Sequence, residues 1–432
     1  MKYEKIDSQL FIENRKRFAK KLKPGSIAVF NSSDIYPSSA DGARPFLQHT
    51  DIFYLSGIDQ EESVLVIAPD AKQEAHKEML FLRETNETIA VWEGHKYTKE
   101  EAFETSGIKS VFWLSDMERV LAEVAFESEF FYLNTNEHYR AGVSVQTRDD
   151  RFRTWCQERF PLHKYERVAP IMHELRAVKS QIEIDLIQKA CDITEKGFRR
   201  ILGFVKPGVM EYEIEAELYH EFIRNRSVGM AYEPIIASGG SACVLHYIEN
   251  NRECKDGDLL LMDFGAEYAN YSSDLTRTIP VNGKFTDRQK DVYNAVLRVQ
   301  KKAYELLVPG NNWFTYHEQV GELMTQELIG LGLITEEDVK NQDPSWPAYK
   351  KYFMHGTSHH LGLDVHDYGS RYHTFEAGMV FTVEPGIYIP EENIGIRIEN
   401  DVVIQETGLP KDLMENIPVT VEEIEALMSE GK

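Results

Sequence analysis

The sequence predicts an α/β (α+β) protein of two domains, and three observations support this fold class. The chain has 432 residues, more than one hydrophobic core usually serves. Short apolar runs alternate with helical stretches up to about residue 165, whereas longer helical patterns and strand pairs follow from about residue 172. Hydrophobic residues make up 42% and charged residues 28%, as in ordinary globular proteins. We therefore expect a small α/β domain with a mixed sheet over residues 1–165 and a second domain over residues 172–432.

The charge balance and the cysteines restrict the classes of partner and the compartment. The formal net charge is −23, so neither nucleic acid nor anionic lipid is an expected partner. No stretch approaches the ~20 apolar residues of a membrane span, and the start MKYEKIDSQLF lacks the apolar region of a signal peptide. The four cysteines show no CxxC spacing. We expect a cytoplasmic protein with free thiols that binds neither nucleic acid nor membrane.

Periodicity predicts the elements of the first domain. Residues 5–23 have helical spacing and end before Pro24-Gly25, which stops a helix. Short apolar runs predict strands at 26–30, 53–55 and 64–67, and helices are predicted at 99–105 and 116–127.

The second domain has longer predicted elements. Helices are predicted at 173–200, 211–224, 287–307 and 317–331. Strands are predicted at 258–264, 273–280, 379–383 and 394–404.

A predicted hairpin over residues 258–280 brings two acidic side chains together. The apolar run before Asp263 predicts a strand buried on both faces. If the chain turns around residues 268–269, Asp263 lies directly opposite Asp274. Opposed like charges are destabilising, and when buried they need either a proton or a shared cation. The pair indicates a cation site, while two solvated acids in a turn remain an alternative of similar weight.

Two further acids and a histidine-rich segment extend this site. Glu384 ends one β-branched run and Glu399 interrupts another, although each alone is more often a strand-end charge in water. The segment MHGTSHHLGLDVHD, residues 354–367, holds four of the 14 histidines, with Gly beside them and Leu and Val between them. Oxygen-rich ligation with one imidazole and no thiolate suits Mn²⁺, with Co²⁺ or Zn²⁺ as substitutes.

These motifs resemble the pita-bread metallopeptidases, a family that includes methionine aminopeptidase, prolidase, aminopeptidase P and creatinase. The residues that match the family's metal ligands are Asp263, Asp274, His359, Glu384 and Glu399. HGTSHHLGLDVHD, DGDLLLMDFGAEY, TVEPGIYI and GIRIENDVVI are most similar to the Xaa-Pro aminopeptidases (aminopeptidase P). KLKPGSIAVF and VWEGHKYTKEEA resemble the N-terminal domain of that subfamily, which methionine aminopeptidases lack. Creatinases have lost the ligands that this chain keeps.

The resemblance implies a pita-bread fold for residues 172–432 and an aminopeptidase P/creatinase-like domain for residues 1–165. It also implies two divalent ions: Asp263 would hold one, His359 with Glu384 the other, and Asp274 and Glu399 would bridge both. Such ions lower the pKa of a shared water and polarise the scissile carbonyl. Glu384 would be the general base. The implied activity is that of a metallo-aminopeptidase, which releases the N-terminal residue before proline by attack of a metal-bridging hydroxide.

The same resemblance implies a set of substrate-binding residues: His246, His355, His366, Tyr388, Arg397, Trp92, Arg371 and Asp41. His246 and His366 are also catalytic candidates, and His366 would shuttle a proton. Asp41 would lie near the free amine of the substrate, in such oligomers from a neighbouring subunit.

Ordinary alternatives stay open for several of these residues. Trp92 and Tyr388 would otherwise be core residues, Arg397 an ion-pair partner of a ligand carboxylate, and Asp41 a solvated loop residue. One departure from the family is Leu47, which stands where related chains usually have Arg before the Gln.

Two other functions remain open at this point. The first is Xaa-Pro dipeptidase (prolidase) activity, which uses the same metal chemistry. The second is a pita-bread scaffold kept as a binding module without catalysis, although such proteins usually lose ligands. The expected partners are peptides with an Xaa-Pro N-terminus, and we expect a homo-oligomer, a dimer or a tetramer.

Overall fold

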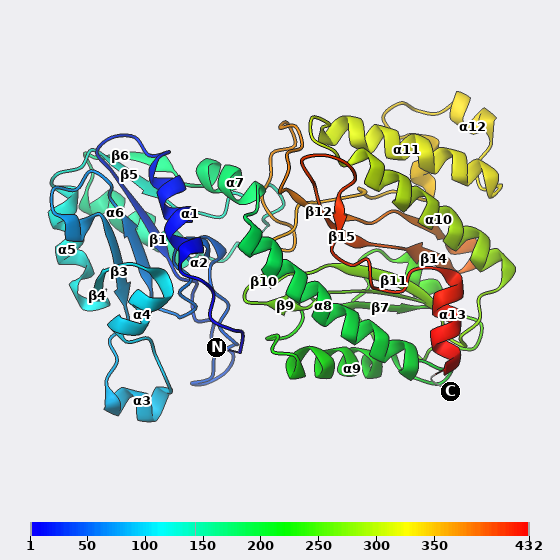
Figure 1. Ribbon diagram of the computed structural model, residues 1–432, viewed down its shortest axis with the longest axis horizontal. Helices are drawn as coiled ribbons and strands as arrows, with labels where there is room; N and C mark the ends of the chain where they lie inside the picture. Colours follow the sequence, from blue (N-terminus) through cyan, green and yellow to red (C-terminus); the bar gives the residue numbers. More distant parts are fainter. Residues whose placement is uncertain (1, 143, 431–432) are drawn as a thin grey trace. The chain divides into compact units, whose positions relative to one another are not determined.

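The computed structural model describes residues 2–142 and 144–430, which form two compact units (Figure 1). The N-terminal unit is Lys5–Leu175, and the C-terminal unit begins at Arg176 and includes the segment up to Glu4. The helix α7 (Ala169–Ala177) contains this boundary. The assignment of residues 1–165 and 172–432 as functional domains stays a prediction. Among the described residues, no helix has both the length and the apolar character needed to cross a membrane.

The N-terminal unit is built on one six-stranded sheet with the order β4-β3-β2-β1-β5-β6. β1 is antiparallel to β2 and parallel to β5, so the sheet is mixed, as predicted. Its strands are β1 (Ser26–Asn31), β2 (Val64–Ile67), β3 (Glu78–Leu82), β4 (Ser110–Trp113), β5 (Phe130–Leu133) and β6 (Lys164–Arg167). The apolar side chains of β1, β2 and β5 form a buried core with those of α5.

The helices of this unit are α1 (Gln9–Ala19), α2 (Thr50–Ser56), α3 (Glu87–Glu93), α4 (Lys99–Ser106), α5 (Met117–Ala125) and α6 (Arg148–Arg159). The prediction of a strand at 53–55 is wrong, because these residues belong to α2. His49 accepts a hydrogen bond from the Asp51 N–H at the start of this helix, and Gly57 ends it in a left-handed conformation. Six of the seven residues of α2 are buried, so the sequence shows no polar face with helical spacing.

The C-terminal unit contains several small sheets, including β11-β8-β7 and β12-β15-β16. Figure 1 shows these strands between helices α8 and α9 on one side and α10 and α11 on the other. The strands are β7 (Ile235–Ser238), β8 (Leu259–Phe264), β9 (Glu267–Tyr268), β10 (Tyr271–Ser272), β11 (Leu275–Pro280), β12 (Val380–Val383), β13 (Gly386–Ile389), β14 (Ile394–Arg397), β15 (Asn400–Val403) and β16 (Lys411–Asp412). The helices are α8 (Gln181–Phe204), α9 (Glu211–Arg224), α10 (Asp287–Leu306), α11 (Trp313–Gly330), α12 (Glu336–Lys340) and α13 (Val421–Glu430).

The long helix predicted over residues 173–200 is two helices, α7 and α8. Ser180 starts α8 with a capping box, in which its side chain accepts from the Glu183 N–H and Glu183 accepts from the Ser180 N–H. The Lys179 N–H donates to the Gly378 carbonyl at 2.9 Å, so the connector bonds to the chain just before β12. The segment between α7 and α8 is therefore not helical, although the helical spacing of apolar residues continues through it.

The strand predicted over residues 394–404 is also divided. β14 pairs with β13, whereas β15 pairs with β12 in another sheet. Between them, the Glu399 N–H donates to the Thr276 carbonyl at 3.0 Å, outside either pairing. The break therefore lies at the acidic residue that interrupts the apolar pattern.

Candidate metal centre

The hairpin of β8 and β11 carries the first two acidic residues, in a register that differs from the prediction. Asp263 pairs with Thr276 and not with Asp274. The turn residues are Ala269 and Asn270, both left-handed with φ of 54° and 65°, which is the conformation of a tight two-residue hairpin turn. Placing the turn one residue later moves every partner by two residues, so Asp263 and Asp274 keep a common face as diagonal neighbours. Their predicted direct opposition is wrong.

Tyr232 joins these two carboxylates. Its hydroxyl lies within hydrogen-bond distance of Oδ1 of Asp263 and Oδ1 of Asp274. Burial and the adjacent carboxylates raise its pKa well above the ordinary value, so the hydroxyl stays neutral. A tyrosine hydroxyl supplies one proton for these two contacts. The sequence offered no signal for Tyr232, which precedes Asp263 by 31 residues.

His359 and Glu384 lie beside this pair. The Nε2 atom of His359 is 3.4 Å from Oδ2 of Asp274 and 3.7 Å from Oε1 of Glu384. Its Nδ1–H donates to the His360 carbonyl at 2.9 Å, because a carbonyl oxygen only accepts. This bond orients the ring so that Nε2 faces the acids, as the outer hydrogen bond of a metal-ligating histidine does.

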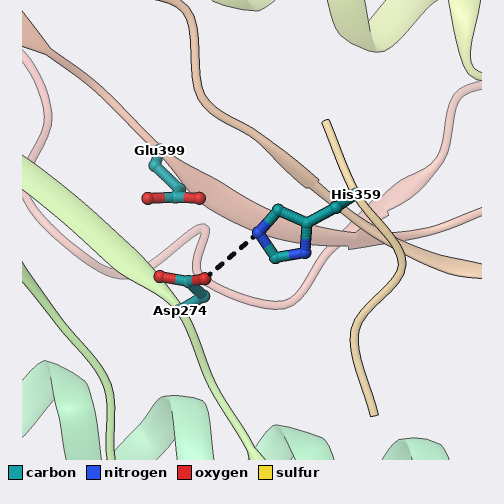
Figure 2. A group of neighbouring side chains, drawn as sticks. All are labelled: Asp274, His359 and Glu399. Carbon is teal, nitrogen blue, oxygen red and sulfur yellow. Dashed lines mark ion pairs between the residues drawn. The ribbon is translucent and has the colours of Figure 1, made fainter. Parts of the chain in front are cut away.

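Glu399 completes the group. Its Oε2 accepts a hydrogen bond from the Thr276 hydroxyl at 2.6 Å. Asp274, His359 and Glu399 each offer a ligand atom, and these atoms all lie within 4.8 Å of one another. Figure 2 shows the three side chains converging on one point, with the ion pair between Asp274 and His359 drawn as a dashed line.

Burial and the repulsion between neighbouring carboxylates disfavour negative charge in the cluster. Burial raises the pKa of Glu384 to about 7, and the carboxylates of Asp274 and Asp263 add to this effect. Burial likewise raises the pKa of Asp263, and it raises that of Glu399 well above its ordinary value, with Asp274 contributing. Burial alone would lower the pKa of His359, but Asp274 and Glu384 raise it to about 9. Divalent cations would remove this repulsion, and four carboxylates with one imidazole are donors that fit them.

A hydrogen-bonded chain leads from Asp263 to a predicted substrate ligand. Arg397 donates from Nη2 to Oδ2 of Asp263 at 2.6 Å and from Nη1 to the Tyr388 hydroxyl at 2.9 Å. The Tyr388 hydroxyl is 2.8 Å from Nε2 of His355, whose Nδ1–H donates to the Gly356 carbonyl. Burial and the charge of Arg397 lower the pKa of His355 to about 3, so Nε2 is unprotonated and accepts from Tyr388.

Arg397 thus forms an ion pair with Asp263, and Tyr388 is buried. These positions match the ordinary alternatives that the sequence left open. Both residues lie next to the acidic cluster, and their contact with substrate stays a prediction.

The remaining candidates of the C-terminal unit have exposed side chains. The ring of His366 stands at 88° to that of His359, with centroids 4.4 Å apart. His246 follows the short 3₁₀ helix at 239–243 and is near enough to His355 to lower its pKa. Arg371 lies with its guanidinium 5.8 Å from the centroid of the Trp313 ring. His366 thus lies beside His359 of the cluster, and His246 lies near His355, the last residue of the hydrogen-bonded chain from Asp263.

Trp92 and Asp41 belong to the N-terminal unit. Both are exposed within that unit, and Trp92, near the end of α3, is 86% exposed. Their roles in substrate binding stay predictions.

Two more residues beside the cluster were missed by the sequence reasoning. Thr276 donates to Glu399, and Asp401 accepts a hydrogen bond from the Asp274 N–H at 2.9 Å. Each lies two residues after a predicted ligand, Thr276 after Asp274 and Asp401 after Glu399. Because alternate residues of an extended chain share a face, this spacing is a signal that could have identified both.

Comparison with known proteins gives the family. Residues 185–406 match the model of metallopeptidase family M24, and residues 11–133 match that of the aminopeptidase P N-terminal domain. The chain belongs to metallopeptidase family M24, and the resemblance inferred from the motifs is confirmed.

Similar chains extend over the whole length. Xaa-Pro aminopeptidase of Escherichia coli (strain K12) is 36% identical over 437 residues, covering 98% of each chain. Xaa-Pro aminopeptidase 3 of Homo sapiens is 30% identical and covers 93% of this chain and 81% of its own. A solved structure of a putative aminopeptidase P from Bacillus anthracis matches with a TM-score of 0.91 at 33% identity over 99% of both chains. A zinc-substituted E. coli aminopeptidase P in complex with product matches with a TM-score of 0.87 at 34% identity over 99% of this chain and 100% of its own. These matches confirm the predicted fold class, including the pita-bread fold.

The raised pKa values predict how the stability of the metal-free protein depends on pH. A group whose pKa is higher in the folded state binds more protons there, so the free energy of unfolding falls as pH rises between its unfolded and folded values. For Glu384 this window runs from the ordinary 4.5 to about 7, and for His359 from 6.5 to about 9. Below pH 6.5 the lowered pKa of His355 acts in the opposite direction. Urea denaturation with chelator present should therefore show a fall on the order of 3 kcal/mol from pH 7 to pH 9, mainly from His359.

Saturation with Mn²⁺ should abolish that fall, because bound ligands are deprotonated at every pH in the window. A metal-free protein whose unfolding free energy is constant or rises from pH 7 to pH 9 would contradict this description of the cluster.

Proposed function

We propose that this chain is an Xaa-Pro aminopeptidase, which releases the N-terminal residue from peptides with proline at the second position. One observation carries the proposal: an acidic cluster with one imidazole, in which burial raises the pKa of Asp263, Glu384 and Glu399, lies in a chain of family M24. Relatives named Xaa-Pro aminopeptidase in E. coli and Haemophilus influenzae, 36% and 34% identical, cover 98% of it.

The ligand assignment divides the cluster between two divalent ions. Asp263 would hold one ion, His359 and Glu384 the other, and Asp274 and Glu399 would contact both. Mn²⁺ suits these donors best, with Co²⁺ or Zn²⁺ as substitutes, because oxygen ligands dominate and no thiolate is present. When bound, such a pair lowers the pKa of water and polarises the scissile carbonyl.

Glu384 is the proposed general base. A carboxylate at this position can accept a proton from the water and release it to the leaving nitrogen. The backbone N–H of Glu384 donates to the Thr357 carbonyl at 2.8 Å, which fixes the residue just beyond β12. The water adds to the carbonyl carbon and gives its proton to Glu384. The carbon–nitrogen bond then breaks, and the proton passes to the proline nitrogen.

The preference for proline follows from what the substrate lacks. An Xaa-Pro bond has no N–H, so a peptidase that docks substrates as an added strand loses a donor there. A site for this bond has to bind the substrate through its carbonyl oxygens and its ring. His246 and His366 would supply imidazole N–H groups for the carbonyl oxygens, and His366 would also carry the proton to the leaving nitrogen. Both ring nitrogens of His355 already have partners, the Gly356 carbonyl and Tyr388, so its predicted contact with substrate would require one of these bonds to be exchanged.

The compartment and the assembly are inferred from weaker observations. All four cysteines are free thiols, which suits a reducing cytoplasm. A homo-oligomer, a dimer or a tetramer, is inferred from the family resemblance alone.

The proposed activity is tested with a small peptide panel after Mn²⁺ is added to the metal-free protein. An Xaa-Pro-Yaa tripeptide should be cleaved between Xaa and Pro, on the order of 100-fold faster in kcat/KM than the matched Xaa-Ala-Yaa peptide. Mass spectrometry of the products locates the cut. Turnover confined to Xaa-Pro dipeptides would identify a dipeptidase instead. No turnover with Mn²⁺, Co²⁺ or Zn²⁺ would support a binding module without catalysis.

The role of Glu384 is tested with Glu384→Gln, which keeps the shape of the side chain but removes its basicity. We expect kcat to fall about 10²–10⁴-fold, while elemental analysis still finds bound metal. Glu376→Gln is the matched control, because Glu376 is exposed before β12 and should leave kcat unchanged. Near-normal turnover by metal-loaded Glu384→Gln would remove Glu384 as the base.

A further inference from the structure

A second group of charged side chains lies buried in the C-terminal unit, around the carboxylate of Asp367. Its Oδ1 accepts a hydrogen bond from Nη2 of Arg176 at 2.6 Å, and its Oδ2 lies 3.1 Å from Nζ of Lys179. All three side chains are 1% exposed. A buried carboxylate between two buried cations is costly to desolvate, and hydrophobic residues often replace such groups without loss of stability. Stability is therefore a weak explanation for this group of Arg176, Lys179 and Asp367, which we call the clamp. Its position in the chain points to a different role.

The two cations belong to a connector that is itself fixed. Arg176 and Lys179 lie at the join of α7 and α8, where the Lys179 N–H bonds to Gly378 just before β12. Arg176 also donates to Oδ2 of Asp364 at 2.6 Å, and its guanidinium lies 4.5 Å from the centroid of the Tyr368 ring. The two cations thus contact Asp364, Asp367 and Tyr368, at the C-terminal end of the histidine-rich segment.

Asp367 closes the turn in which it lies. Its N–H donates to the His360 carbonyl at 2.9 Å, and its Oδ1 accepts from the Tyr368 N–H at 2.8 Å. A Cβ atom on Gly362 would lie 2.1 Å from Oδ2 of Asp367, so the carboxylate packs directly against the backbone of the turn. The turn from residue 360 to residue 367 is therefore built around this carboxylate.

His366 directly precedes Asp367 in the same turn. Its side chain is exposed, whereas that of the next residue, Asp367, is buried. The His366 ring is perpendicular to that of His359, with centroids 4.4 Å apart. A backbone fixed at Asp367 therefore fixes the point of the chain from which the imidazole of His366 reaches His359.

The clamp is ionic. Burial alone would raise the pKa of Asp367, but the charges of Arg176 and Lys179 hold it below the ordinary value. The carboxylate therefore stays ionised around neutral pH and keeps both cationic partners.

We propose that Asp367, held by Arg176 and Lys179, is a positioning residue that orients His366 toward the substrate. This inference rests on the proposed function, in which His366 contacts the substrate and transfers a proton. A merely structural role would lower activity by loosening the fold, independently of His366.

A double-mutant cycle separates the two roles. Asp367→Asn should lower kcat/KM for the Xaa-Pro-Yaa peptide about 10–100-fold, mainly through kcat, with metal content equal to that of the wild type. In the His366→Ala background the same substitution should cost less than about 3-fold, because the residue it positions is gone. Lys179→Met, which keeps the bond between Arg176 and Asp367, gives a second cycle if Asp367→Asn does not fold.

The matched control is Asp149→Asn. Asp149 is a buried carboxylate of the N-terminal unit that accepts a hydrogen bond from Asn31 at 2.7 Å. Its effect on kcat/KM, whatever its size, should be the same with and without His366. Equal fold-losses for Asp367→Asn in both backgrounds would overturn the proposal.

A second readout does not depend on activity. In metal-free protein with labelled histidine, the ring resonance of His366, assigned by its loss in His366→Ala, should shift or broaden in Asp367→Asn and stay unchanged in Asp149→Asn. A moved resonance with no peptide cleavage by the wild type would keep the positioning role and reject the proposed function. An unmoved resonance with additive losses in an active enzyme would reject the positioning role alone.

Discussion

The mutual repulsion of buried carboxylates is the constraint on which the rest of the C-terminal unit depends. Asp263, Asp274, Glu384 and Glu399 converge beside His359, and burial raises the pKa of three of them. Without metal, protons and donors have to hold the cluster together. Tyr232 and Arg397 share Asp263, and Thr276 donates to Glu399. These donors compensate only part of the negative charge. Divalent cations would compensate the remainder, so the residues that destabilise the metal-free protein are the same ones that would bind metal.

The backbone places three of the four acids where regular pairing stops, whereas Asp263 lies within β8. Asp274 precedes β11, Glu384 lies between β12 and β13, and Glu399 lies between β14 and β15. Each N–H finds a partner outside a ladder: Asp274 donates to the Asp401 carboxylate, Glu384 to the Thr357 carbonyl and Glu399 to the Thr276 carbonyl. Ending the strands here satisfies the backbone and leaves the side chains free to turn into one site. Asp367 likewise lies outside a strand. Its side chain is buried in a loop, next to the exposed imidazole of His366 that we propose it positions.

The sequence predicted the cluster better than it predicted the chain path between its members. The family resemblance supplied the five predicted ligands, and three of them, Asp263, Glu384 and Glu399, also end or interrupt an apolar run. The register of the hairpin differed by two residues, because Ala269 and Asn270 adopt left-handed conformations that apolar spacing does not reveal. Tyr232 and the contact of Arg176 with Asp367 were missed for another reason. They join residues 31 to 191 positions apart, and no pattern within a single segment encodes such a contact.

The central claim is that the acidic cluster is a site for two divalent ions, and titration calorimetry of the metal-free protein with Mn²⁺ tests it most directly. At pH 7, His359, whose pKa is about 9, carries a proton that metal binding must displace. Titrations in two buffers with different heats of ionisation should give two ions per chain and a net release of protons. Binding of fewer than two ions, or binding without proton release, would contradict the account.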